Sequence, residues 1–233
     1  FVLGARRMRL ADRASLGYGT PRARFVRELL LGLALGLTMM LPVVLAVDAL
    51  DLRHWRAGMP PDAEGWALLT LEGLLRGLAV SFIEETFLRG ALFTAVARSS
   101  GTRTAIVATA LIYSALHFFG QVRIPAEEVS YASGFTLLAG TLGAFADPLS
   151  MLDAFICLAA VGVVLGIVRA LTGNIAACIG LHAGWVCIIT LVRETSVVDR
   201  DAPARFLVSD LDGFVGWLVL AWTVIIGAVI AWI

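Results

Sequence analysis

The sequence predicts an all-α protein, a polytopic transmembrane helix bundle of about seven or eight helices with a four-helix core that carries the functional site. Hydrophobic residue types make up 59% of the 233 residues and charged types only 15%, and the mean hydropathy is +0.88. A soluble domain is typically about 45–50% apolar and about 25% charged. Several uncharged stretches are long enough to cross a bilayer, which takes about 20 residues. We expect no strands, because an open sheet edge leaves backbone groups unsatisfied in lipid.

Hydrophobic stretches divide the chain into candidate spans, and we expect residues 29–233 to form a single transmembrane domain with a motif-bearing core at about 65–192. The stretch 65–98 is interrupted by charges, and it forms either one long helix or two helices that break near Gly77. A Gly-rich, less hydrophobic stretch at 129–146 is a weak span or a re-entrant segment. The other expected spans are 29–47, 104–122, 151–168, 174–192 and 214–233.

Residues 1–28 form a polar and basic N-terminal segment, in which seven arginines outnumber Asp12 and Glu28. Cytoplasmic loops carry an excess of basic residues, so we expect the N-terminus in the cytoplasm. All 18 basic residues are arginine, a usage typical of GC-rich bacterial genomes, which favours a bacterial cytoplasmic (inner) membrane. If 65–98 crosses once, the later basic residues on the cytoplasmic side are Arg98, Arg103, Arg193, Arg200 and Arg205.

The stretch "SFIEETFLRG" places Glu84, Glu85 and Arg89 inside a hydrophobic segment. A charged side chain at the centre of a membrane helix costs about 2.5–3.5 kcal/mol on the insertion scale. Glu85 and Arg89 are spaced i, i+4 and can pair on one helix face. Glu84 points about 100° away and needs another partner, a proton or a water-filled cavity. An ionisable residue within the membrane indicates a functional site.

Two histidines also lie within expected spans. His117 follows Tyr113 by one turn on the same helix face, and His182 is flanked by Gly180 and Gly184, which permit close helix approach. A carboxylate and an imidazole that converge on one water form a general-base site, and a second imidazole can stabilise an oxyanion. These residue types favour hydrolysis of a carbonyl compound, most simply a peptide bond.

Three short motifs carry a resemblance to a known family. "EETFLR" fits E-E-x-x-x-R, "YSALH" is similar to F-x-x-x-H with Tyr113 in place of Phe, and "HAGWV" lies where the third motif is H-x-x-x-N. Their order and spacing, over roughly residues 80–190, resemble the CPBP (CAAX-protease and bacteriocin-processing, or Abi) intramembrane glutamic endopeptidases. Eukaryotic members of that family cleave prenylated C-terminal tails.

The resemblance implies a role for each matching residue. It makes Glu84 the catalytic carboxylate that activates water together with His117, and His182 the histidine on the oxyanion side. Glu85 and Arg89 become the supporting pair, beside Tyr113. The resemblance also implies catalysis without a metal or organic cofactor, and a site that opens toward the cytoplasm.

One position departs from the family pattern, because Val186 stands where the third motif has Asn. Valine cannot donate a hydrogen bond, and the loss of one oxyanion donor can cost about 10²–10³ in rate. Asn174 is too far along the chain to replace it; a backbone N–H, Ser114 or a water are the remaining candidates. Two hypotheses stay open: an active protease with a modified oxyanion hole, or a pseudoenzyme that serves as a membrane scaffold or assembly subunit of a larger complex.

A proton-coupled transporter is a further alternative, since buried Glu and His residues also form proton relays. The chain is short for a transporter and has no internal repeat of the kind that many transporters carry. Zinc-protease chemistry is not indicated, because H-E-x-x-H is absent from the sequence. The expected partners are membrane lipids and a membrane-associated peptide or protein substrate. A net charge of zero gives no support for nucleic-acid binding.

Overall fold

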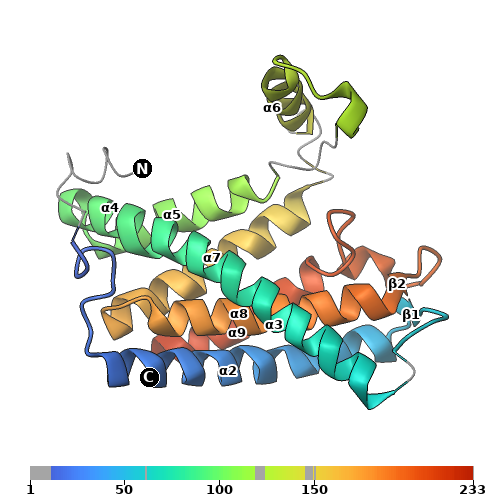
Figure 1. The fold of residues 1–233 in the computed structure, drawn as a ribbon, viewed down its shortest axis with the longest axis horizontal. Coiled ribbons are helices and arrows are strands. Elements are labelled where there is room, and N and C mark those ends of the chain that lie inside the picture. Colours follow the sequence, from blue (N-terminus) through green and yellow to red (C-terminus); the bar gives the residue numbers. More distant parts are fainter. Residues whose placement is uncertain (1–11, 61, 119–123, 145–148, 150, 233) are drawn as a thin grey trace.

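The structure is a computed structural model that describes residues 12–60, 62–118, 124–144, 149 and 151–232. Its described part is almost entirely helical (Figure 1). The helices are α2 (Arg22–Ala49), α3 (Ala63–Glu85), the π-helical segment η1 (Thr86–Leu92), α4 (Phe93–Ser100), α5 (Thr102–Leu116), α6 (Ser133–Ala144), α7 (Leu152–Thr172), α8 (Ala176–Thr195) and α9 (Trp217–Trp232). Two 3₁₀ turns cover Ala126–Glu128 and Arg205–Leu207. The all-α fold class is therefore confirmed.

Among the described residues, four helices are long and apolar enough to cross a membrane: α2, the continuous helix Ala63–Ser100, α7 and α8. Helices α5 and α9 are apolar but shorter. The stretch 65–98 is thus one helix, and it does not break at Gly77, which is buried against α8. The irregularity lies farther along, in the π-helical turns of η1, directly after the glutamate pair.

Helices α2 and α8 pack side by side and run parallel, because glycines on both allow their backbones to touch. A Cβ atom on Gly180 would lie 2.0 Å from the carbonyl oxygen of Leu29, and one on Gly36 would lie 2.4 Å from the carbonyl oxygen of Leu181. Only small residues fit such an approach, as is common between membrane helices. The close approach expected beside His182 is therefore observed.

The other core helices pack in antiparallel pairs, α3 against α8 and α5 against α7. A Cβ atom on Gly77 of α3 would lie 2.5 Å from the carbonyl oxygen of Ala183 on α8. Helix α5 lies along α7, where Gly162 contacts Ala110 and the Ser114 hydroxyl donates to a backbone carbonyl of α7. Helices α3, α5, α7 and α8 form the four-helix core, and α9 packs against α7 on its outer side.

Two short strands pair at one end of the bundle, which corrects the expectation of no strands. β1 (Arg53–Trp55) follows α2 and pairs antiparallel with β2 (Ser196–Val198), which follows α8. Both strands lie beyond the ends of helices α2 and α8. The unpaired backbone groups at their edges therefore do not have to be satisfied inside the helix bundle. The buried Arg53 guanidinium also donates to the backbone carbonyls of Ser196 and Gly213, which ties the following loop to the strands.

In the described part of the stretch 129–146, no helix is long enough to span a membrane. Its helix α6 has 12 residues, about 18 Å, against a hydrocarbon core of about 30 Å, and it stands apart from the packed helices (Figure 1). Because one expected crossing is missing, Arg193, Arg200 and Arg205 lie at the bundle end opposite the N-terminal segment, and the expectation that they share its side is wrong. Helix α5 is also shorter than the expected 104–122, and 119–122 lies outside the described residues.

The segment before α2 crosses the π-helical turns of η1 and forms hydrogen bonds with η1 and with α4. The Tyr18 hydroxyl lies 2.5 Å from the Thr86 hydroxyl, and Thr94 donates to the backbone carbonyl of Ser15 at 2.7 Å. Since the Thr86 hydroxyl donates within its own helix, Tyr18 is the donor in the first contact. These bonds hold η1, and with it the residues on its inner face, against the start of the chain.

Candidate active site

Glu85, Arg89 and His182 form an enclosed ionic cluster between α3, η1 and α8. Glu85 Oε1 accepts from Arg89 Nη1 at 3.1 Å and lies 3.0 Å from His182 Nδ1. The side chains of Glu85 and Arg89 are fully buried, and that of His182 is 4% exposed. The i, i+4 pair predicted from the sequence is confirmed. The contact between Glu85 and His182, from residues 97 positions apart, was not predicted.

The Arg89 side chain also connects the cluster to the other two core helices. Its Nη2 donates to the backbone carbonyl of Gly162 on α7 at 3.1 Å, and its guanidinium carbon lies 4.8 Å from the ring centre of Tyr113 on α5. The backbone carbonyl of Arg89 accepts from Arg169 Nε at 2.9 Å. Single π-helical turns often occur at functional sites, and this one places a buried cation among four helices.

The contact with Glu85 fixes the orientation of His182. An ionised carboxylate can only accept hydrogen bonds, so His182 Nδ1 donates to Glu85 and Nε2 is directed elsewhere. Nε2 lies 4.0 Å from Glu84 Oε2. The two adjacent glutamates therefore meet the two nitrogens of one imidazole, Glu85 from the enclosed side and Glu84 from the accessible side.

Glu84 is the accessible member of the pair, with 32% of its side-chain surface exposed. It lines a cavity of about 440 Å³ between α3, η1 and α5, together with Tyr113, His117 and four apolar residues. Its Oε2 is enclosed and has no hydrogen-bond partner among the described residues. Of the three possibilities that the sequence leaves open for Glu84 (another partner, a proton or a water-filled cavity), the structure shows a cavity, and a carboxylate at its wall can bind water.

His117 lies at the C-terminal cap of α5. Its Nδ1 is 2.9 Å from the backbone carbonyl of Tyr113, which can only accept, so Nδ1 carries the hydrogen and the lone pair of the neutral ring is on Nε2. The Tyr113 and His117 rings are 4.4 Å apart between centres, and those of Tyr113 and His182 are 5.9 Å apart. The Tyr113 ring is thus near both histidines.

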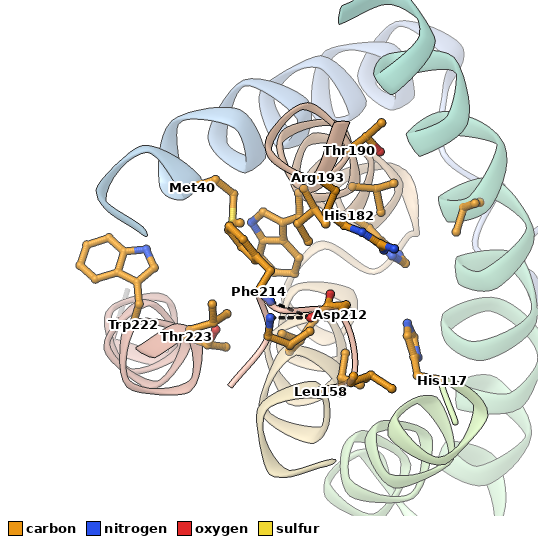
Figure 2. A pocket seen from close by; sticks show the side chains of 18 of the residues that line it. Met40, His117, Leu158, His182, Thr190, Arg193, Asp212, Phe214, Trp222 and Thr223 are labelled. Carbon is orange, nitrogen blue, oxygen red and sulfur yellow. Dashed lines mark hydrogen bonds between the residues drawn. The ribbon is translucent and has the colours of Figure 1, made fainter. Parts of the chain in front are cut away.

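A larger cavity of about 490 Å³ begins at Tyr113, His117 and His182 and ends at exposed charged residues (Figure 2). In Figure 2, His117 and His182 approach the same space from opposite sides. One face of α8 lines the cavity from His182 to Arg193, about 16 Å along the axis. That face consists of His182, Trp185, Val186, Ile189, Thr190 and Arg193.

Val186 lies on this cavity wall, one turn after His182. Two polar side chains considered as replacements for the missing Asn, Asn174 (already judged too far along the chain) and the remaining candidate Ser114, are engaged elsewhere. The fully buried Asn174 donates to Glu28 Oε2 at 2.6 Å, and the Ser114 hydroxyl donates to the backbone carbonyl of Phe155 at 2.7 Å. Neither side chain is available to the cavity.

The third histidine and the cysteines lie outside the site. His54 is on β1, with Nε2 2.7 Å from Asp199 Oδ2, and all three cysteines are free and buried. Within the described ranges, no group of three or more His, Cys, Asp or Glu side chains is arranged to hold a metal ion.

Comparison with known proteins found one similarity. The family model described as "type II CAAX prenyl endopeptidase Rce1-like" matches residues 66–188. That range covers more than half of the chain and includes all residues of the candidate site from Glu84 to Val186. Searches of curated proteins and of solved structures each found no match.

Proposed function

We propose that the chain, which belongs to the Rce1-like family of type II CAAX prenyl endopeptidases, is an intramembrane endopeptidase that hydrolyses a peptide bond of a membrane-associated protein. The observation that carries the proposal is the grouping of three side chains inside an apolar helix bundle: Glu84 and His117 line one cavity, His117 and His182 line a second, and Glu84 Oε2 lies 4.0 Å from His182 Nε2. Glu85 and Arg89 are enclosed behind them, so their charges stabilise the site and leave Glu84 to react.

The reaction follows from these positions. Glu84 and the Nε2 lone pair of His117 lie beside the same cavity. There, Glu84 takes a proton from a water molecule. The water oxygen bonds to the carbonyl carbon of the substrate, and the π electrons of the carbonyl move to its oxygen, which His182 faces. When the C–N bond breaks, the amine nitrogen takes the proton from Glu84, and the carboxylate is restored.

Replacement of His117 by alanine tests this assignment. In proteoliposomes that contain a library of labelled single-span polypeptides, we expect His117→Ala to cleave about tenfold or more slowly than the wild type, which is a barrier increase of about 1.4 kcal/mol or more. The matched control is His54→Ala, which removes the histidine on β1 and should cleave at the wild-type rate. Equal rates for the two variants would refute the role of His117, and no cleavage by the wild type would refute the proposed activity.

The membrane orientation is part of the proposal. We place the N-terminus in the cytoplasm of a bacterial inner membrane, because residues 1–28 carry seven arginines and basic residues are retained inside. Arg193 and Glu194 are exposed at the other end of the bundle, where the larger cavity ends. In this orientation the charged end of the cavity faces away from the cytoplasm, contrary to the cytoplasmic opening that the family resemblance implies.

Cysteine labelling tests the orientation without any need for activity. The three native cysteines are buried, so a new surface cysteine is the reactive one. In intact bacteria we expect a membrane-impermeant maleimide to label Glu194→Cys, at the cavity end, and not Arg103→Cys, which is exposed at the N-terminal end. Both should be labelled after the membranes are disrupted. The reverse pattern in intact cells would place the cavity end in the cytoplasm.

A further inference from the structure

The chain departs from the family motifs at two positions, and both line the same cavity. Tyr113 stands where the second motif has Phe, and Val186 stands where the third has Asn. The first change adds a hydroxyl group and the second removes an amide. We propose that the Tyr113 hydroxyl is the oxyanion donor of this site and replaces the Asn that Val186 lacks; the inference rests on the proposed peptidase activity.

Tyr113 is held in one place by the groups around its ring. The residue is only 3% exposed. Its ring centre lies 4.4 Å from that of His117 and 5.9 Å from that of His182, and the Arg89 guanidinium covers the ring at 4.8 Å. A donor with a fixed position stabilises a developing charge better than a mobile one, because it needs no reorganisation during the reaction.

The hydroxyl group of Tyr113 is available to a ligand. Among the described residues, three enclosed side-chain polar atoms lack a hydrogen-bond partner, namely Glu84 Oε2, Glu85 Oε2 and Arg89 Nε. The Tyr113 oxygen is not one of them, and no described residue bonds to it, so the oxygen is open to the cavities. Tyr113 lines both the larger cavity and the smaller one that holds Glu84, and thus lies where water and the substrate carbonyl would meet.

The other side-chain donors near the site are already engaged. Asn174 and Ser114 bond elsewhere, and His182 Nδ1 contacts Glu85. The Tyr113 O–H therefore supplies a neutral donor beside His182. It donates a hydrogen bond to the oxyanion when the water oxygen bonds to the carbonyl carbon, and it keeps its proton throughout, so the proton balance of the reaction is unchanged.

Four proteins test this inference: the wild type, Tyr113→Phe, Val186→Asn and the double variant. We expect Tyr113→Phe to lower kcat by about 10²–10³ with KM nearly unchanged. Val186→Asn alone should change kcat by less than about threefold, because a donor is already present, but in the Tyr113→Phe background it should restore at least about tenfold. Tyr131→Phe, which alters a fully exposed tyrosine, is the matched control and should behave as wild type.

Two results would overturn the inference: a kcat for Tyr113→Phe within about twofold of wild type, or a loss that Val186→Asn does not reduce. Phenylalanine is the family's own residue at this position, so the variant should fold. Binding of a hydrophobic tripeptide aldehyde, whose hydrate resembles the tetrahedral intermediate, gives a readout without turnover. Tyr113→Phe should weaken that binding about tenfold or more, and equal binding would also overturn the inference. Absence of cleavage by the wild type refutes the proposed activity, whereas the aldehyde measurement still decides the role of Tyr113.

Discussion

Substitution of Glu84 by glutamine is expected to lower the rate of peptide hydrolysis by about 10²–10⁴, the range associated with loss of a positioned proton-transfer group. Glutamine keeps the shape of the side chain but cannot take a proton from water. The structure separates Glu84 from its neighbour: Glu85 is enclosed between Arg89 and His182, whereas Glu84 reaches a cavity. The substitution therefore removes the reacting group and leaves the ionic cluster in place.

The measurement is cleavage of the labelled polypeptides in proteoliposomes, with thermal unfolding in detergent as the test of folding. Glu72→Gln is the matched control, since Glu72 is on the same helix but is exposed and paired with Arg76. We expect Glu84→Gln and Glu72→Gln to unfold within a few degrees of the wild type and to differ only in activity. If Glu84→Gln retained the wild-type rate, the carboxylate would not be the base, and the proposed mechanism would be wrong.

Sequence reasoning succeeded where the physical cause is local. Exposure of long uncharged, apolar stretches to water is unfavourable, so these stretches are expected to lie in a membrane. Helices satisfy their own backbone hydrogen bonds there, so composition and hydropathy predict an all-α membrane bundle. The pairing of Glu85 with Arg89 follows from the i, i+4 spacing. The glycines beside His182 indicated a close helix contact, and α2 fills it.

The errors came from features that the local sequence does not determine. The stretch 129–146 is apolar enough to be considered a span, yet its helix is too short to cross, and one missing crossing moves every later loop to the other side. The contact of Glu85 with His182 joins residues 97 positions apart, and no local period encodes it. The π-helical turns after Glu85 contact the N-terminal segment and Arg169, which no sequence window of one helix contains.

Substitution of Arg89 by methionine is the change that we expect to destabilise the fold most. Methionine fills much of the same volume but leaves Glu85 fully buried without its cation. Removal of one partner from a buried ion pair typically costs about 3–5 kcal/mol, because the remaining charge is neither solvated nor paired. The matched control is Arg76→Met, which breaks an exposed pair with Glu72 and should cost about 0–1 kcal/mol. Thermal unfolding in detergent, followed by circular dichroism, should therefore give a much lower Tm for Arg89→Met than for Arg76→Met.

The double variant Glu85→Gln/Arg89→Met separates stability from function. Glutamine removes the unpaired charge and still offers a carbonyl oxygen to His182, so the Tm should recover a large part of the loss. Activity should stay low, because His182 then lacks the carboxylate whose negative charge supports a positive charge on the ring. If the double variant were as unstable as Arg89→Met, the destabilisation would come from lost packing and not from an unpaired charge. If it were stable and fully active, the buried pair would have no role in catalysis.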